Sequence, residues 1–293
     1  MIPASYIQAW STTAPWPDSR QIEQDLLICR ALCDLFSAPA LAGKIAFRGG
    51  TAINKLLFRQ SLRYSEDIDL VQTQAEPIGA TVDAIREALS WLGKCQREQA
   101  GHSMHLVFKF TPEADVQATL KLKVEINTRE HGSLFGLQSY PFTVENDWYQ
   151  GRADIVSFTP EELFGTKFRA LLQRRKNRDL FDLHQGLEQL SLDTSKLIAC
   201  FDHYLALESK PITRAMAEQR MLEKLTRDIT EDIAPLLPAG VRFNADDARL
   251  AFEHIWRELI TQLKGEGWKL TNQAIAQLRK SGHPKLLHGL GDP

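Results

Sequence analysis

The chain contains few cysteines and few of the patterns that mark secreted proteins, proteins with structural metal sites or membrane proteins. Only four of its 293 residues are cysteines and none forms a C-x-x-C pair, which argues against a disulfide framework and favours a reducing, cytoplasmic location. No apolar run approaches the roughly 18 residues that a membrane-spanning helix needs. The segment 1–17 has neither the basic nor the apolar region of a signal peptide. We therefore expect a cytoplasmic protein that makes no membrane contact.

Two further absences concern charge and histidine. The net charge is only −2, from 35 basic and 37 acidic residues, so a nucleic-acid-binding surface would have to be a local patch. The eight histidines include no H-E-x-x-H spacing, and we expect His102 and His105 to be surface or structural residues. What remains is an ordinary globular composition, 43% hydrophobic and 25% charged, long enough for one large or two modest domains.

Hydrophobic periodicity changes character along the chain. The first half mixes helical and alternating segments, whereas almost every periodic segment after Pro160 is helical. This order predicts an α+β protein, with a mixed-sheet domain over residues 1–155 and a helical domain over 156–293, separated after a loop at 146–151. The helices expected first are 21–36, 52–58 and 82–92, and the strands are 44–47, 67–72, 105–110 and 120–127. The later helices are 161–173, 180–190, 215–229, 245–263 and 271–278.

Two glycines stand between a predicted strand and a predicted helix. Gly49 and Gly50 would let the backbone approach phosphate oxygens closely, and unpaired N–H groups at the start of a helix attract anions. Thr51 is expected to cap that helix. Taken alone, a Gly-Gly turn is more often a structural turn than a phosphate site.

A pair of aspartates opens the next predicted strand. Residues i and i+2 of a strand point the same way, so Asp67 and Asp69 share one face while Ile68 and Leu70 pack behind them. Two neighbouring carboxylates repel each other unless a cation lies between them, and hard oxygen ligands suit Mg²⁺. A single D-x-D can also be a solvated strand end, but its position after the Gly-Gly turn favours a site.

A third carboxylate belongs to the polar face of the strand predicted at 120–127. Glu125 could join Asp67 and Asp69 in holding two Mg²⁺ ions for attack at phosphorus. The alternative is a solvated strand face, which Lys121 and Lys123 on the same side would also explain.

A lysine lies on the apolar side of the helix that Thr159 and Pro160 introduce. At 100° per residue, Lys167 falls inside the arc occupied by the apolar residues of this helix. A buried lysine needs a partner or an anionic ligand. Its long stem could instead carry the ammonium out to solvent. Helix geometry alone leaves both alternatives open.

Taken together, these stretches resemble the polymerase-beta-like nucleotidyltransferases, and more closely the AbiEii-type nucleotidyltransferase toxins of bacterial toxin–antitoxin and abortive-infection systems. The resemblance covers about residues 40–190. The matching stretches are Gly49–Thr51, Arg63–Leu70, Val124–Asn127 and the segment from Glu161 through Lys167 to Arg175–Leu183.

The resemblance implies a set of roles. Asp67, Asp69 and Glu125 would bind Mg²⁺, with Mn²⁺ as the alternative ion, and the catalytic residues would be these three with Lys167 and Asp179. The nucleotide-binding residues would be Gly49, Gly50, Thr51, Arg63, Ser65, Arg178 and Asp182. An independent interpretation of Asp179 is that it caps the following helix, with Asp182 three residues later.

The implied reaction moves a nucleoside monophosphate from an NTP to RNA, in some relatives to the tRNA 3′ end, and a cognate antitoxin is the implied partner. The segment 167–178 contains six cations and no acid, which could steer RNA or could simply be solvated. A small molecule or a protein hydroxyl is the alternative acceptor. The other alternative is a non-catalytic NTP-binding module, against which the intact Asp67, Asp69 and Lys167 weigh.

Overall fold

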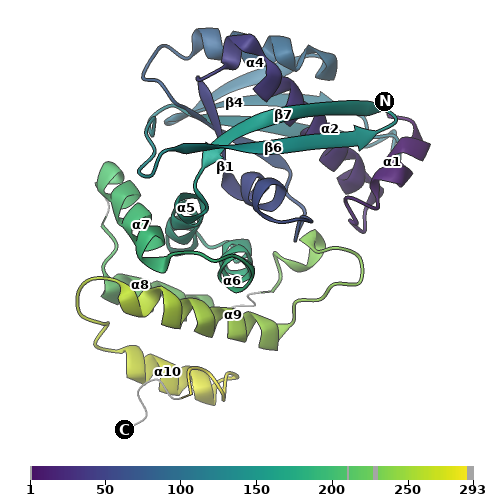
Figure 1. Cartoon of the computed structure of the whole chain (residues 1–293). Helices are drawn as coiled ribbons and strands as arrows, with labels where there is room; N and C mark the ends of the chain where they lie inside the picture. Colours follow the sequence, from purple (N-terminus) through teal and green to yellow (C-terminus); the bar gives the residue numbers. More distant parts are fainter. Residues whose placement is uncertain (1, 210, 227–229, 289–293) are drawn as a thin grey trace. The chain divides into compact units, whose positions relative to one another are not determined.

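A seven-stranded mixed sheet forms the centre of the first of two units in the computed structural model (Figure 1), which describes residues 2–209, 211–226 and 230–288. The first unit comprises Met1–Leu163 and Leu236–Val241, and the second comprises Phe164–Pro235 and Arg242–Pro293. The sheet followed by a helical region confirms the predicted α+β class.

The strand order is β3-β4-β5-β2-β1-β7-β6. Strands β2 and β5 pair in parallel, as do β1 and β7, and the remaining neighbours are antiparallel. The strands are β1 (Ile45–Arg48), β2 (Asp67–Gln72), β3 (Cys95–Ala100), β4 (Ser103–Phe110), β5 (Leu120–Asn127), β6 (Leu137–Asn146) and β7 (Tyr149–Phe158). The central position of β1 and β2 brings both halves of the predicted motif into the middle of the sheet.

Strands β1, β2, β4 and β5 were predicted from the sequence, and β3, β6 and β7 were missed. β5 buries every second residue, which is the pattern that made it recognisable. β6 alternates only from Tyr140 to Asn146, and of its residues only Val144 and Asn146 are buried. The predicted interdomain loop at 146–151 is wrong, because Asn146 pairs with Tyr149 at the turn of the β6–β7 hairpin.

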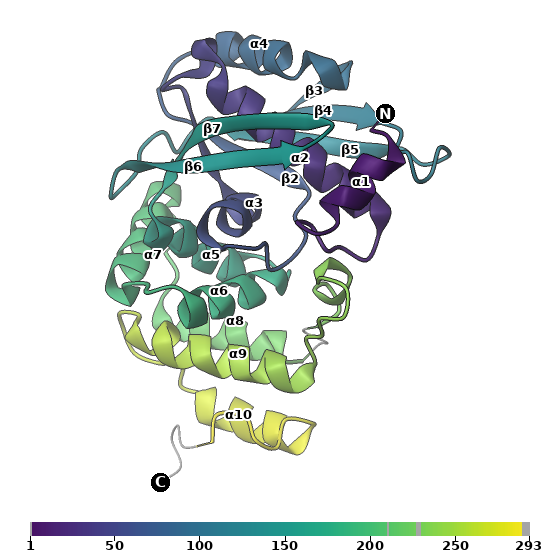
Figure 2. The same cartoon turned by 45° about the vertical axis from the view of Figure 1, so that its right-hand side comes forward.

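The helices of the first unit are α1 (Ala4–Trp10), α2 (Ser19–Ser37), α3 (Gly49–Ala52) and α4 (Gly79–Ala88), with the short turns η1 (Pro39–Leu41), η2 (Ile53–Leu57) and η3 (Ser90–Leu92). Helix α2 lies across the sheet against β6 and β7 (Figure 2). Asp18 caps it by accepting a hydrogen bond from the Arg20 amide. The segment 236–241 completes this unit, since the Leu236 carbonyl accepts from the Tyr64 amide and the Ala239 amide donates to the Pro15 carbonyl.

A buried carboxylate ties α2 to its surroundings. The Asp25 side chain is 1% exposed and accepts hydrogen bonds from the indole nitrogens of Trp10 (2.9 Å) and Trp16 (3.1 Å). Its third partner is the Lys55 ammonium at 2.6 Å. A buried charge is tolerated only when it is paired and hydrogen-bonded, and these three donors meet that need.

Replacing Asp25 by alanine is therefore expected to lower the free energy of unfolding of the first unit by about 3–5 kcal/mol, because the Lys55 ammonium would remain buried without its carboxylate. Denaturant titration measures this loss. Asp83→Ala is the control, since the Asp83 side chain is 73% exposed and its ion pair with Arg86 should contribute little. Equal stability of the two variants would contradict the prediction.

The second unit is built from helices, which are α5 (Pro160–Gln173, beginning in the first unit), α6 (Arg178–Gln189), α7 (Thr194–Glu208), α8 (Arg214–Lys224), α9 (Ala245–Glu258) and α10 (Thr271–Lys280), with η4 (Ala234–Leu236) and η5 (Ile260–Gln262). Gly165 lets α7 pack closely on α5, because a Cβ there would lie 2.6 Å from the Cys200 Cβ. Among the described helices, none is long and apolar enough to cross a membrane.

Two of the helices predicted in the second unit end earlier than expected. The helix predicted at 215–229 ends at Lys224, and residues 227–229 lie outside the described part of the chain. The helix predicted at 245–263 ends at Glu258, where Leu259 leaves the helical backbone conformation and η5 follows. The two later apolar residues that suggested continuation, Ile260 and Leu263, are nevertheless buried.

Candidate active site

Three carboxylates lie on adjacent strands at the centre of the sheet. Parallel pairing sets Asp69 opposite Glu125 and Asp67 opposite Lys123, while antiparallel pairing sets Arg48 opposite Asp69. Since paired residues on neighbouring strands project to the same face, the three predicted metal ligands converge, as the sequence suggested.

Gly49 lies directly against this cluster. Its backbone φ is +84°, a left-handed conformation that favours glycine, and a Cβ at this position would be 2.0 Å from the Asp69 Oδ2. The glycine is therefore required twice, by the backbone turn after β1 and by the approach of the aspartate. Gly50 follows in the first turn of α3, and its carbonyl accepts a hydrogen bond from the side-chain amide (Nδ2) of Asn54.

The surroundings of Asp69 and Glu125 shift the pKa values of these two carboxyl groups in opposite directions. Burial, with the negative charges of Asp67 and Glu125, raises the pKa of Asp69 to about 6. Burial alone would also raise the pKa of Glu125, but Lys123 and His105 outweigh it and hold that pKa below its ordinary value. The donor set of three carboxylates, with excess negative charge at Asp69, fits a hard divalent cation such as Mg²⁺.

Two basic side chains in the cluster were not assigned to the site from the sequence. The Lys123 ammonium bridges Asp67 Oδ2 at 3.3 Å and Glu125 Oε2 at 3.2 Å. The His105 Nε2 lies 3.4 Å from the same Glu125 oxygen. Strand alternation placed Lys123 on the side of Glu125, but only the parallel register with β2 brings it to Asp67. The prediction that His105 is a surface or structural residue did not anticipate this contact.

Thr51 does not cap α3, which corrects the sequence-based expectation. The residue before the helix is Arg48, and no side chain caps it. Instead the Thr51 hydroxyl donates to the Asp67 carbonyl (2.5 Å) and hydrogen bonds with the Ser65 hydroxyl (2.7 Å). These two residues thus attach α3 to the start of β2. Arg63 is 2% exposed, and its guanidinium donates to the Tyr64 carbonyl.

Lys167, in the second unit, is buried as its position on α5 predicted. Its ammonium lies 2.9 Å from Asp182 Oδ2 and 3.2 Å from Asp179 Oδ1. The Arg174 guanidinium also binds Asp179, through two hydrogen bonds of 2.7 Å. Asp179 is not the cap of α6, because Asn177 occupies that position. Predicted residues from two helices therefore form one buried ion-pair cluster, and Arg178 lies half-buried at the first residue of α6.

The buried carboxylate of Asp179 gives this cluster a defined pH dependence. Burial would raise its pKa, but Lys167 and Arg174 hold it well below the ordinary value of 3.8. A depressed folded-state pKa contributes stability above the unfolded pKa that is lost as the pH falls. Asp179→Asn should therefore cost roughly 3 kcal/mol or more at neutral pH, and this difference should shrink below about pH 4.

Denaturant titrations of the wild type and this variant across the acid range measure the effect. Asp246→Asn is the control, because the Asp246 side chain is 86% exposed. A stability difference that stays constant down to strongly acid pH would refute the assigned cause.

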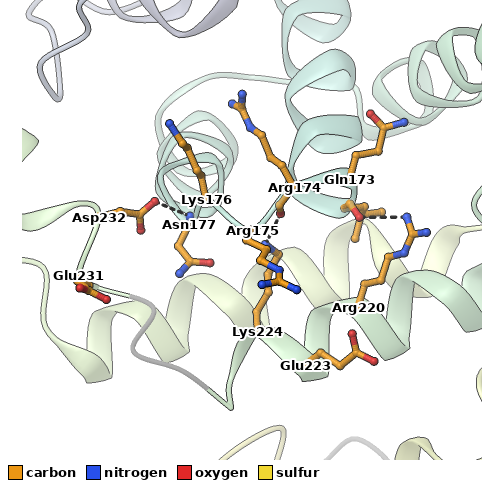
Figure 3. Close-up of a pocket in the computed structure, with 11 residues that line it drawn as sticks. Gln173, Arg174, Arg175, Lys176, Asn177, Arg220, Glu223, Lys224, Glu231 and Asp232 are labelled. Carbon is orange, nitrogen blue, oxygen red and sulfur yellow. Dashed lines mark hydrogen bonds between the residues drawn. The ribbon is translucent and has the colours of Figure 1, made fainter.

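The six cations predicted as one basic stretch separate in the structure. Arg169 pairs with Glu208 at 3.0 Å, while Lys167 and Arg174 pair with the aspartates of α6. Arg175 and Lys176 are exposed and line a cavity of about 570 Å³ with Arg220 and Lys224 of α8 (Figure 3). The acidic residues at this cavity are Glu223, Glu231 and Asp232, of which Asp232 accepts from the Asn177 amide (2.8 Å).

A glycine pair between β1 and a helix, with two aspartates on β2 and a glutamate on β5 of a mixed sheet, is the arrangement of a nucleotidyltransferase. Solved structures share the fold. The nucleotidyltransferase toxin MenT4 of Mycobacterium tuberculosis is 12% identical, with a TM-score of 0.62 over 96% of this chain and 99% of that one. JHP933 of Helicobacter pylori is 16% identical, with a TM-score of 0.51 over 91% and 97% of the two chains. A comparison with curated protein sequences gives no match.

Residues 30–257 match the profile of the family described as nucleotidyl transferase AbiEii toxin, type IV toxin–antitoxin system. The chain belongs to this AbiEii family, which confirms the resemblance drawn from its motifs. It is therefore a nucleotidyltransferase toxin that uses an NTP as substrate.

Proposed function

We propose that this toxin transfers a nucleoside monophosphate from an NTP to an RNA acceptor in a reaction that depends on Mg²⁺. The observation that carries the proposal is the convergence of Asp67, Asp69 and Glu125 beside Gly49. Oxygen ligands on a rigid sheet, next to a backbone without a side chain, suit a triphosphate and its ion.

In this proposal Asp67, Asp69 and Glu125 hold the divalent cation, either Mg²⁺ or Mn²⁺. Such an ion, when bound, neutralises charge on the triphosphate and lowers the pKa of an acceptor hydroxyl. Glu125 acts as a ligand rather than as a proton acceptor, because Lys123 and His105 favour its ionised form.

The other chain residues bind and orient the substrate. Gly49 and Gly50 admit phosphate oxygens to the backbone, and Thr51 and Ser65 fix α3 relative to Asp67. Lys167 supplies positive charge to the phosphates, with Asp179 and Asp182 holding its ammonium in place. Arg178, at the start of α6, is the further phosphate-contacting residue of the proposal.

RNA is favoured over a small-molecule acceptor by the cavity that Arg175, Lys176, Arg220 and Lys224 line. Cations from the α5–α6 turn and from α8 around one cavity suit the repeated phosphates of a nucleic acid, whereas a small molecule needs no such surface. The tRNA 3′ end is the acceptor suggested by family resemblance. Toxin family membership also supports a cognate antitoxin as partner.

The test is to incubate the purified protein with Mg²⁺, total RNA and each labelled NTP in turn. The expected result is label on RNA, concentrated in tRNA, that depends on Mg²⁺ and is absent with Asp67→Asn. Parallel reactions offer protein and small-molecule extracts without RNA. Label that appears on those acceptors and not on RNA would overturn the RNA assignment, and no label on any acceptor would overturn the proposed reaction.

A further inference from the structure

Two histidines and a glutamate of the second unit converge outside the cluster of catalytic candidates. His184 and Glu188 are four residues apart on α6 and so share one helix face, and His254 reaches them from the neighbouring α9. The His184 Nδ1 lies 3.1 Å from the His254 Nδ1, and the His254 Nδ1 lies 3.2 Å from the Glu188 Oε1. The three candidate ligand atoms all lie within 4.8 Å of one another.

These three side chains place more acceptor atoms together than the protons between them can satisfy. Only one proton fits between two imidazole nitrogens 3.1 Å apart, and the Glu188 carboxylate competes for the same proton from the other side. Two imidazole nitrogens and one carboxylate oxygen therefore face the same point. A single proton there can hydrogen-bond to only some of these three electron-pair donors. The two rings are nearly perpendicular, with an interplanar angle of 87°, so they do not stack.

We propose that His184, Glu188 and His254 form a zinc site that joins α6 to α9, with a water molecule as the fourth ligand. Zinc bonds of about 2.0–2.1 Å in a tetrahedron separate neighbouring ligand atoms by about 3.4 Å, close to the two short distances observed. Two imidazoles and one carboxylate are a donor set that zinc accepts.

The surroundings agree with a cation. The carboxylates of Glu188 and Asp247 place negative charge near the two imidazoles. The side chains of Glu188 and His254 are 55% and 22% exposed, so an ion can reach them from solvent. Helix α6 also carries Asp179 and Asp182, which pair with the Lys167 ammonium of α5. A metal that joins α6 to α9 would therefore stabilise the helix that provides these two partners.

The experiment is a calorimetric titration of the full chain with ZnCl₂ after chelator treatment, with excess Mg²⁺ present to occupy the carboxylates of the first unit. One zinc ion should bind per chain with a micromolar or tighter Kd and raise the melting temperature by several degrees. The double variant His184→Asn, His254→Asn should lose this binding, and Glu188→Gln should weaken it about tenfold or more.

The controls separate the site from adventitious binding and from misfolding. His203→Gln removes a histidine of α7 outside the cluster and should bind zinc like the wild type. The metal-free melting curves of all variants should match the wild type to within a few degrees, and Glu188→Gln, an exposed substitution, keeps the test usable if the double variant does not fold. The proposal is overturned if the wild type binds no zinc, or if Glu188→Gln and the double variant bind it as tightly as the wild type does.

Discussion

Asp69→Asn is expected to reduce nucleotidyl transfer by about 10³-fold or more while leaving the fold intact. The substitution removes one carboxylate charge from the proposed cation site, and a bound divalent ion contributes several kcal/mol to stabilising charge at phosphorus. Asparagine matches the shape of aspartate, and it also removes the buried charge whose desolvation, with repulsion from Asp67 and Glu125, raises the pKa of Asp69. We therefore expect the variant to be as stable as the wild type, or more so.

The measurement is the initial rate of label transfer from NTP at saturating Mg²⁺, together with a denaturant titration of each protein. Asp83→Asn serves as the control, because it removes a carboxylate from an exposed position on α4. If Asp69→Asn kept its rate within tenfold of the wild type, the proposed ligand set would be wrong.

Gly49→Ala is expected to reduce the transfer rate by about 10²-fold, because its methyl group would occupy the place of the Asp69 carboxylate. The added Cβ would lie 2.0 Å from the Asp69 Oδ2 and 2.9 Å from the Asp69 Cβ, so the aspartate or the β1–α3 turn must move. Displacements of about 1 Å at a reacting centre cost about this much in rate. Forcing alanine into a positive φ should cost a further 1–2 kcal/mol or so of stability.

Gly43→Ala provides a matched control for the backbone cost. Gly43 precedes the same strand and has a φ of +69°, but a Cβ there would meet nothing within 4 Å. Gly43→Ala should lose only the stability that the positive φ costs, Gly49→Ala should lose at least as much, and only Gly49→Ala should lose activity. Equal rates for the two variants would show that the contact between Gly49 and Asp69 does not matter for the reaction.

The positions of the carboxylates could be predicted because strand alternation is a local property. Asp67 and Asp69 share a face whatever their strand pairs with, and the polar face of β5 included Glu125 for the same reason. Register is not local. The pairing of Asp67 with Lys123, and the approach of His105 from β4, depend on how three strands align, which no periodicity encodes.

The basic stretch shows the same limit for helices. Its sequence contains no acid between Lys167 and Arg178, yet Asp179 and Asp182 on the next helix and Glu208 on α7 form ion pairs with half of its cations. The placement of Lys167 on an apolar face correctly indicated a buried ammonium that needs a partner. Which partner it finds depends on the packing of α5 against α6 and α7.

The return of Leu236–Val241 to the first unit has a consequence for synthesis on the ribosome. Tyr64 and Pro15 find their backbone partners only in a segment that is translated roughly seventy residues after Leu163. At a translation rate of about 5–20 residues per second, the segment Leu236–Val241 would be synthesised several seconds after Leu163. During that interval the emerging chain already contains Asp67, Asp69 and Glu125, but the unit that positions them is still incomplete. A toxin assembled in this order reaches its finished form only late in translation.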